Sequence, residues 1–394
     1  MKHHPRVVLR KNLASSIRSG HPWLYQDAVE PPHDLGTGTV VDVVTRDGKF
    51  VARGLWDAHS PIAVRIWTTT ETEKLDFELA RRRVESALDL RRHLVGLGDT
   101  EALRLIHGEA DRMPGIVCDY YAKTCVFKLD SAAVRWLLPA IVNQIVQSPF
   151  SVDHAVLRQS SRTDGEPAVL EPLLGNIPTD TIHITENGIM LEVDIARGHK
   201  TGLYLDQRDN RRRIQQLSAG MRVLNVFSYT GGFSVAAACG GADSVTSVDI
   251  GAPVIAAAKR NFRLNGLDPE LDAYTFVTAD VFQWLDKSRD PYDLVIVDPP
   301  SMAPSAASLK AAERAYRKLN ALALLRVAPG GILFTASCSS HITETQLINI
   351  VGESAEDAKR QVRIVEFRGA APDHPVLPSF PEGRYLTGLL LYVD

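Results

Sequence analysis

Apolar and polar residues follow three different patterns along the chain. In the first, short alternating runs predict strands at 6–10, 38–44, 50–54 and 62–67, and Asp47-Gly48 between the second and third runs is typical of a hairpin turn. Strands this short and this close together indicate a small all-β unit in the N-terminal part of the chain.

The second pattern mixes helical and strand-like segments. Helices are predicted over 75–94 and 133–146, and strands over 115–120, 124–129 and 154–158. This order of elements favours a separate α+β domain. Residues 161–178, which follow, are rich in proline, glycine and charge, and they predict a domain boundary or a long loop.

The third pattern starts with a hairpin and then becomes regular. Strands at 181–186 and 189–195 flank Asn187-Gly188, a second two-residue turn. From Val223 onward, strands and helices alternate to the C-terminus. Such alternation predicts a parallel sheet with helices on both faces.

The composition is that of an ordinary soluble protein. A chain of 394 residues, 45% hydrophobic and 23% charged, is long enough for two or three domains. A formal net charge of -3 argues against a protein that coats nucleic acid with its whole surface. Basic residues nevertheless cluster within 1–26 and within 196–213, and such clusters either bind phosphates or form solvated faces.

Cysteine usage and the N-terminal segment bear on the compartment. The chain has only 4 Cys and no C-x-x-C pair, which favours reduced thiols in the cytosol and disfavours a zinc or redox motif. The first residues lack an apolar leader, and no later run approaches the length of a membrane span. We therefore expect a cytoplasmic protein without a membrane partner and without a metal.

Acidic residues follow successive strands of the regular half. The strand at 222–226 leads into a loop with two glycines, and the next three strands lead to Asp249, Asp280 and Asp298. Loops at the carboxyl ends of such strands bind ligands in open α/β sheets, and a carboxylate there can accept the hydroxyls of a ribose. A nicotinamide dehydrogenase fits poorly, because the G-x-G-x-x-G spacing is missing. The pattern favours a cationic, adenosine-containing ligand such as S-adenosylmethionine, although any single Asp can also be a helix cap.

Several segments of the chain resemble the motifs of a known family. Its segments 223–232, 247–249, 279–282 and 298–301 are similar to the ordered motifs of class I S-adenosylmethionine-dependent methyltransferases. Its segments 21–25, 107–111, 201–211 and 381–386 are similar to motifs of the bacterial large-subunit ribosomal RNA (cytosine-C5) methyltransferases that carry an N-terminal PUA domain. The resemblance covers essentially the whole chain.

The resemblance implies a multidomain α/β fold. The expected parts are a small PUA-like β-barrel that binds RNA at 1–73, a central α+β domain at 74–180, and a methyltransferase domain at 181–394 that begins with a β-hairpin and contains a Rossmann-like seven-stranded sheet. It also implies ribosomal RNA as the partner and a homodimer as the assembly.

Cys338 is the expected catalytic nucleophile. It lies in Ser337-Cys338-Ser339, which matches a strand-end motif of the family. Because C5 of cytosine is a poor nucleophile, a thiolate that adds to C6 activates it. Asp298 would then bind the N3/N4 edge of the base, and no residue is assigned to remove the C5 proton. The alternative for Cys338 is a small buried side chain at the end of a strand.

The cofactor residues are carried over from the family motifs. Asp249 would bind the ribose and Asp280 the adenine amino group, while Phe227, Ser228 and Tyr229 would line the methionine end and Gln207 and Arg208 would close over it. Gly231, Val281 and Asp298 complete the predicted cofactor-binding set. Another RNA cytosine-C5 methyltransferase class has a second cysteine where this chain has Ser301, so the release step stays open.

The sequence leaves alternatives open for some residues and for the activity. Arg211-Arg212-Arg213 is either a solvated helix face or an RNA contact, and Trp23 and Tyr25 either stack on unpaired bases or pack. The same scaffold also suits an RNA N-methyltransferase acting on guanine or adenine, or a catalytically inactive RNA-binding assembly factor. Attack on C6 requires an unstacked base, which favours a flipped or single-stranded cytidine.

Overall fold

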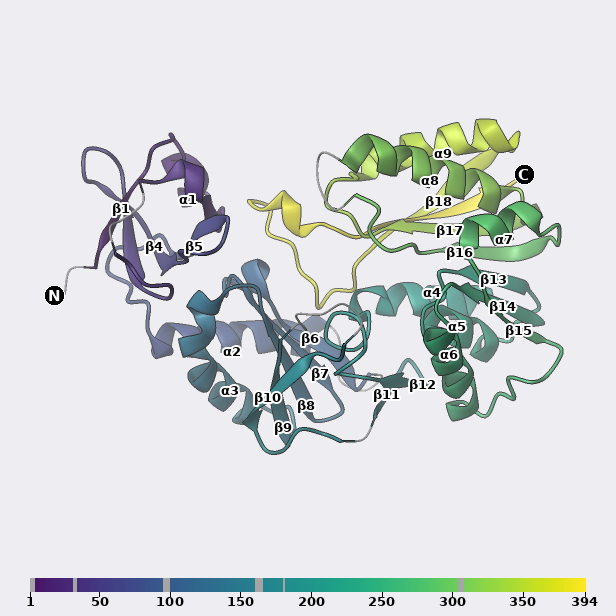
Figure 1. The fold of residues 1–394 in the computed structure, drawn as a ribbon, viewed down its shortest axis with the longest axis horizontal. Coiled ribbons are helices and arrows are strands. Elements are labelled where there is room, and N and C mark those ends of the chain that lie inside the picture. Colours follow the sequence, from purple (N-terminus) through teal and green to yellow (C-terminus); the bar gives the residue numbers. More distant parts are fainter. Residues whose placement is uncertain (1–3, 31–33, 95–99, 160–165, 180, 304–307) are drawn as a thin grey trace. The chain divides into compact units, whose positions relative to one another are not determined.

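The computed structural model describes residues 4–30, 34–94, 100–159, 166–179, 181–303 and 308–394 (Figure 1). The chain forms two compact units. The first contains residues 1–184, 193–204 and 372–383, and the second contains 185–192, 205–371 and 384–394. The first unit therefore includes a segment from late in the sequence, residues 372–383.

The first unit begins with a five-stranded sheet of order β1-β3-β4-β5-β2. Its elements are β1 (Arg6–Val8), α1 (Ala14–Arg18), β2 (Trp23–Tyr25), β3 (Val40–Val44), β4 (Phe50–Trp56) and β5 (Ile62–Thr68). The turn at Asp47-Gly48 joins β3 to β4 as predicted, with Gly48 in the left-handed region at φ 80°. Apolar side chains such as Val41, Val64 and Leu24 fill the core of this sheet, which confirms the expected small β domain.

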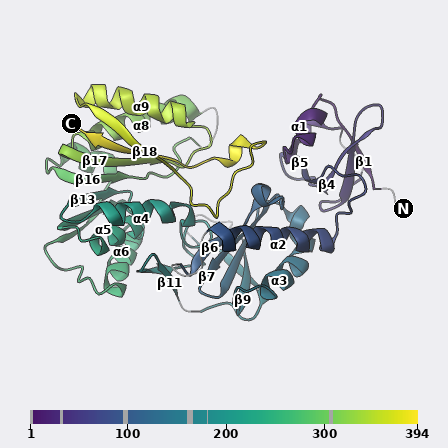
Figure 2. The ribbon, with the colours of Figure 1, turned by 180° about the vertical axis from the view of Figure 1, so that it is seen from behind.

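A second five-stranded sheet, of order β10-β9-β8-β7-β6, follows in the same unit. Its elements are α2 (Phe77–Leu94), β6 (Ala102–His107), β7 (Ile116–Tyr121), β8 (Thr124–Leu129), α3 (Leu138–Val146), β9 (His154–Gln159) and β10 (Val169–Leu174). The helices α2 and α3 lie side by side over this sheet (Figure 2). Their apolar residues and those of the inner strand faces form one core, so the α+β character is confirmed.

Two local predictions in this part of the chain were only partly right. Residues 169–174 are not part of a loop, because β10 pairs antiparallel with β9 at the edge of the sheet. Residues 161–165 of the same predicted loop lie outside the described part of the chain. The helix predicted over 133–146 is confirmed from Leu138 onward as α3, in whose first turn Pro139 lies, but the residues before it form a 3₁₀ turn at Ala132–Leu137.

A buried polar network ties the late segment 372–383 to the second sheet. The Arg104 backbone N–H donates to the Asp373 carboxylate at 2.8 Å, and Arg91, which is fully buried, donates to the Asp373 carbonyl at 2.8 Å. Arg104 also forms a two-point pair with Asp119, whose carboxylate accepts from the Thr201 hydroxyl at 2.5 Å. The first unit thus buries polar groups from three distant parts of the sequence, and each has a partner.

The second unit contains a seven-stranded sheet of order β15-β14-β13-β16-β17-β19-β18. Its strands are β13 (Arg222–Val226), β14 (Ser244–Asp249), β15 (Tyr274–Thr278), β16 (Tyr292–Val297), β17 (Val327–Ser337), β18 (Val362–Gly369) and β19 (Thr387–Val393). The helices α4 (Arg208–Leu217), α5 (Gly232–Cys239) and α6 (Ala252–Leu264) cover one face, and α7 (Val281–Lys287), α8 (Leu309–Leu324) and α9 (Glu344–Ala358) cover the other (Figure 1).

This arrangement confirms the Rossmann-like seven-stranded sheet but corrects one detail. The prediction of a parallel sheet was wrong for β19, which runs antiparallel to both β17 and β18. Parallel strands need a crossover that returns the chain to the starting edge of the sheet. No helix of that kind lies between β18 and β19, where the chain instead passes through segment 372–383 of the first unit.

A short hairpin precedes the large sheet. It pairs β11 (Ile182–Glu186) with β12 (Ile189–Val193). Asn187 and Gly188 both have positive φ, 51° and 78°, as a two-residue turn of this kind requires. The hairpin predicted from Asn187-Gly188 is therefore confirmed.

Candidate functional site

The loop after β13 is sharply folded. Phe227 and Tyr229 have φ of 56° and 48°, values that non-glycine residues seldom adopt. Gly231, at φ 78°, is the N-cap of α5, and a Cβ there would lie 2.8 Å from the Cβ of Ala258 on α6. Strained backbone of this kind persists where the surroundings fix it, often at a ligand site.

Asp249 joins the loops after β13 and β14. Its carboxylate accepts the Tyr229 backbone N–H at 2.9 Å through Oδ2 and the Gly251 N–H at 3.0 Å through Oδ1. Deeper in the fold, the Ser234 hydroxyl contacts Asn225 at 2.9 Å and Ser247 at 2.7 Å, which links α5 to both strands. These contacts fix the carboxylate relative to the loop.

Ser228, in the loop after β13, has a buried hydroxyl that is available to a ligand. Its side chain is 5% exposed, and its hydroxyl has no hydrogen-bond partner within the described ranges. Buried polar groups in folded proteins are almost always paired. An unpaired hydroxyl next to the strained residues Phe227 and Tyr229 is therefore suited to a polar ligand atom at this loop.

Asp280 and Val281 open α7. Asp280 is the N-cap of the helix, and its Oδ1 accepts the Gln283 N–H at 2.9 Å. The helix-cap interpretation is thus correct for one carboxylate oxygen. Val281 is buried in the core beneath the sheet, at 3% exposure. Thr278 at the end of β15 pairs with Asp249 on β14, so the two carboxylates follow neighbouring strand ends.

The register of the sheet brings the acidic strand ends to one edge. Val226 of β13 pairs with Val248 of β14 on one side and with Val297 of β16 on the other. The next residues along these strands are Phe227, Asp249 and Asp298. The loop residues Phe227, Ser228 and Tyr229 and the two carboxylates therefore lie along the same carboxyl-end edge of adjacent parallel strands.

Gln207 and Arg208 lie at the start of α4. Both side chains are buried, with Gln207 accepting from the Asn210 amide at 2.6 Å and Arg208 donating to Asp209 at 3.1 Å. The same helix packs on the start of α5, because a Cβ at Gly232 would lie 3.1 Å from the Arg211 side chain. This contact places α4 against the helix that follows the β13 loop.

Arg211 is neither a solvated residue nor an RNA contact. It is 4% exposed and forms a two-point pair with buried Glu186, at 2.6 and 2.7 Å. Burial opposes its charge, but the Glu186 carboxylate outweighs that effect and, with Asp206 and Asp298 adding, raises the pKa of Arg211. The guanidinium therefore stays charged inside the fold.

Cys338 lies in the turn after β17, against the loop after β16. Its side chain is half-buried, and its thiol lies 3.7 Å from the Pro299 carbonyl. The Ser339 hydroxyl donates to the Ala303 carbonyl at 2.9 Å, which joins the same two loops a second time. The strands themselves pair through Val297 and Thr335. Cys338 is thus held beside the segment that begins with Asp298.

The other predicted residues have plainer surroundings. His341, which follows in the same turn as Cys338, is exposed, and its backbone N–H donates to the Ser339 hydroxyl at 3.3 Å. Trp23 packs edge-on against Phe380 at 4.5 Å between ring centroids and donates to Glu109 at 2.8 Å. Tyr25 is 45% exposed, so packing describes Trp23 and stacking on a base stays open for Tyr25.

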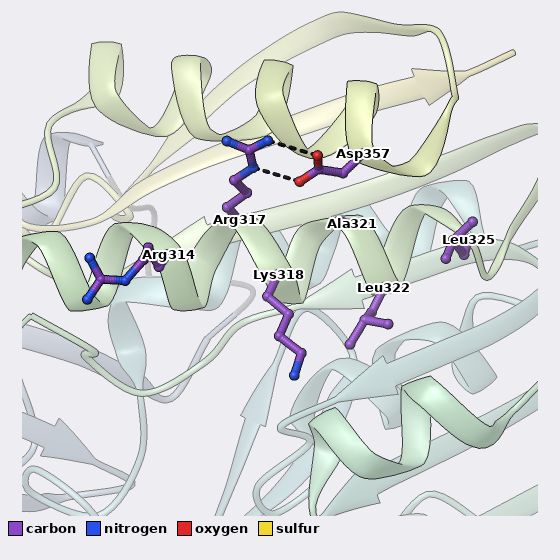
Figure 3. A pocket seen from close by; sticks show the side chains of 7 residues that line it. All are labelled: Arg314, Arg317, Lys318, Ala321, Leu322, Leu325 and Asp357. Carbon is purple, nitrogen blue, oxygen red and sulfur yellow. Dashed lines mark hydrogen bonds and ion pairs between the residues drawn. The ribbon is translucent and has the colours of Figure 1, made fainter.

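A surface hollow of about 420 Å³ lies elsewhere in the second unit (Figure 3). It is lined by Arg314, Arg317, Lys318, Ala321, Leu322, Leu325 and Asp357. Two of these lining residues, Arg317 and Asp357, form a two-point ion pair with each other. None of the predicted site residues lines this hollow.

Two features are absent from the described part of the chain. No group of three or more His, Cys, Asp or Glu side chains there could hold a metal ion. No described helix is both long enough and apolar enough to cross a membrane.

Comparison with known proteins identifies the family. Residues 123–382 match the model of the S-adenosylmethionine-dependent methyltransferases, and residues 7–69 match a PUA-like domain. A protein of Klebsiella pneumoniae named "Ribosomal RNA large subunit methyltransferase I" is 38% identical over 98% of this chain and 97% of its own. A Deinococcus radiodurans protein named "Ribosomal RNA large subunit methyltransferase" is 40% identical over 99% and 98%.

Solved structures share the fold. A methyltransferase crystallised with SAH, SMU.776, has a TM-score of 0.85 at 24% identity, and the match covers 98% of this chain and 100% of that one. At this identity the similarity speaks for the fold alone. With a family model matched over 123–382 and two relatives 38% and 40% identical over nearly the whole length, the chain belongs to the S-adenosylmethionine-dependent methyltransferases with an N-terminal PUA-like domain, and S-adenosylmethionine is its cofactor.

Proposed function

We propose that this protein methylates C5 of a cytidine in large-subunit ribosomal RNA, with Cys338 as the nucleophile. The observation that carries the proposal is the half-buried Cys338 thiol beside the loop that begins with Asp298. The names of the Klebsiella and Deinococcus relatives support ribosomal RNA as the substrate. The PUA-like domain would position that RNA mainly by its shape and backbone.

The cofactor would be held along the carboxyl ends of β13, β14 and β15. Asp249 would accept the ribose hydroxyls, and the unpaired Ser228 hydroxyl would meet a polar atom of the methionine end. Asp280 would face the adenine amino group with the carboxylate oxygen that does not cap α7. Gln207 and Arg208 would close the site. Bound there, S-adenosylmethionine supplies an electrophilic methyl group and becomes S-adenosylhomocysteine.

Cys338 would make C5 reactive. Its thiolate adds to C6, a C6–S bond forms, and the C5–C6 π electrons move to C5, which then accepts the methyl group. Removal of the C5 proton by a base returns the electron pair between C5 and C6, breaks the C6–S bond and releases the thiolate. Asp298 would hold the N3/N4 edge of the base during addition. The ring has to be unstacked for attack from above, so the target would be flipped or single-stranded.

The test is a methylation assay on unmodified ribosomal RNA with nucleoside mass spectrometry of the digest. Wild type is expected to form 5-methylcytidine and Cys338→Ala to form none, because the adduct cannot form without the thiol. Cys239→Ala is the matched control, since Cys239 is an exposed thiol on α5 of the same unit. A methylated guanine or adenine nucleoside, or full activity of Cys338→Ala, would reject the proposal.

A further inference from the structure

Tyr316 lies beneath the turn that carries Cys338. It is on α8, but the α8 side chains labelled in Figure 3 lie on the outer surface of that helix, whereas Tyr316 is 0% exposed. It belongs to the apolar core formed by β16, β17, α8 and α9. A tyrosine this deep normally has a partner for its hydroxyl.

The Tyr316 hydroxyl has no hydrogen bond of good geometry to any residue that the structure describes. Its ring packs in one core with Met302 and Ala303 of the loop after β16, and the Ser337 side chain and the Met302 backbone are polar groups close to its hydroxyl. Burial first, and then the nearby Cys338 and Asp298 charges, raise the pKa of Tyr316, so the phenol stays neutral. An unpaired hydroxyl in an apolar layer costs stability, and a phenylalanine would avoid that cost.

Two further polar atoms continue inward from Tyr316. Asn320 is one helical turn further along α8, and Thr335 is on the same face of β17 as Ser337. The Asn320 side-chain oxygen and the Thr335 hydroxyl are also buried without a hydrogen-bond partner among the described residues. Three buried polar atoms without partners in the described part of the chain, from Tyr316, Asn320 and Thr335, therefore belong to the facing sides of α8 and β17. Ser337 is the last residue of β17 on that side.

Ser337 belongs both to β17 and to the turn Ser337-Cys338-Ser339. Its hydroxyl oxygen accepts the Ser339 backbone N–H at 3.4 Å, across Cys338. On the outer side, contacts from Cys338 to Pro299 and from Ser339 to Ala303 join the same turn to the loop after β16. On the inner side, Tyr316 packs in one core with Met302 and Ala303 of that loop, and its hydroxyl lies close to Ser337 of the turn.

We propose that Tyr316 is a positioning residue, which sets the spacing between the Ser337-Cys338-Ser339 turn and the Asp298 loop that attack on C6 requires. The inference rests on the proposed function. Tyr316 touches no reacting atom. Its hydroxyl lies between one residue of each loop, so a shift of either loop changes the surroundings of the other.

The test compares Tyr316→Phe with Tyr292→Phe in the full-length protein. Tyr292 is a matched control, because it is also a buried tyrosine, at the start of β16, and its hydroxyl contacts Thr246 of β14 at 3.4 Å, at the opposite end of β16 from Asp298. For Tyr316→Phe we expect kcat for 5-methylcytidine formation to fall about 3- to 10-fold, because the hydroxyl that keeps the two loops apart is gone and the thiol moves from its position for attack. KM for RNA and Kd for S-adenosylhomocysteine should stay unchanged. Tm should stay unchanged or increase, because the variant removes an unpaired buried hydroxyl. Tyr292→Phe should keep its kcat.

A second readout follows the adduct itself. RNA that carries 5-fluorocytidine retains the C6–S bond, because fluorine at C5 cannot leave as a proton does, and Tyr316→Phe should accumulate the adduct more slowly than wild type. An unchanged rate of adduct formation, or a loss of kcat that Tyr292→Phe shares or that follows a lower Tm, would show that Tyr316 is only structural. If wild type forms no 5-methylcytidine, the proposed function fails and this inference with it; if wild type forms it and Tyr316→Phe is unaffected, this inference alone fails.

Discussion

Gly231 shows how a single residue sets the cofactor loop. Its φ of 78° is costly for any residue with a Cβ, and α6 approaches so closely that a methyl group would meet Ala258 at 2.8 Å. Gly220 has a similar φ of 71° but nothing within 4 Å of a Cβ. The two glycines therefore separate the cost of backbone conformation from the cost of a clash.

We predict that Gly231→Ala destabilises the protein more than Gly220→Ala does. The left-handed backbone alone costs an L-residue about 1–2 kcal/mol, and at Gly231 the contact with Ala258 adds to it. Urea unfolding of the two variants measures this difference, and titration with S-adenosylhomocysteine should show weaker binding only for Gly231→Ala. Equal stability and equal affinity of the two variants would mean that the loop adapts to the methyl group.

At the scale of elements, the short hairpin of β11 and β12 is fastened to helices by two ion pairs of different kinds. Glu186 and Arg211 of α4 are both almost fully buried, at 1% and 4% side-chain exposure. Glu192 pairs with Arg260 of α6, whose side chain is 51% exposed. Removing one partner of a buried pair leaves an uncompensated charge, whereas an exposed pair contributes little.

We predict that Glu186→Gln lowers the free energy of unfolding by about 3–5 kcal/mol, because Arg211 then keeps its buried charge without the carboxylate that pairs with it at two points. Glu192→Gln, on the same hairpin, should change it by less than about 1 kcal/mol. Chemical denaturation of both variants measures the effect. In the double variant Glu186→Gln/Arg211→Met part of the loss should return, and a double variant that is less stable than Glu186→Gln would contradict this account.

The same elements show which features local sequence can predict. Turn chemistry is local, so Asp47-Gly48 and Asn187-Gly188 were sufficient to predict both hairpins. The edge strand β10 was missed because most of its residues are exposed or half-exposed and carry no clear alternation, and the direction of β19 depends on a connection that only the tertiary fold reveals.

In the candidate site, the acidic strand ends were predictable because parallel strands bring their carboxyl ends to one edge. The burial of Arg211 was not, since its partner Glu186 is 25 residues away. Tyr316 and its hydroxyl were also missed, because an aromatic residue at a helical spacing reads as ordinary core. The roles of Cys338 and of the cofactor residues, and the boundaries at 73 and 180, stay predictions.

At the scale of the whole molecule, the late segment 372–383 is held by a network that depends on histidine being neutral. The Arg104 guanidinium lies 3.1 Å from His107 Nδ1, which has to accept this hydrogen bond, and the His374 ring lies 5.1 Å from the His107 ring. Burial, followed by the Arg104, His374 and Arg91 charges, lowers the pKa of His107 well below its ordinary value. Asp373 opposes this only in part.

We predict that acid destabilises the protein through His107. At a pH between the lowered pKa of His107 in the folded state and the ordinary value of 6.5, the unfolded chain binds a proton that the folded chain does not. The free energy of unfolding therefore decreases as the pH falls below about 6.5, by at most about 1.4 kcal/mol per pH unit. Unfolding free energies of wild type and His107→Gln from pH 7.5 to 5 measure the slope, with exposed His59→Gln as the control. The slope should be smaller only in His107→Gln, and three equal slopes would refute the assignment.

Segment 372–383 also has a consequence for biosynthesis. Asp373, which accepts from Arg104 and Arg91, is added to the chain about 270 residues after them. Domains usually fold as they leave the ribosome, the N-terminal one first. Here the polar network of the first unit cannot close until nearly all of the second unit has been synthesised, so the nascent chain carries an unfinished N-terminal half throughout translation, and a stop codon before residue 373 would leave buried arginines in that half without their last acceptor.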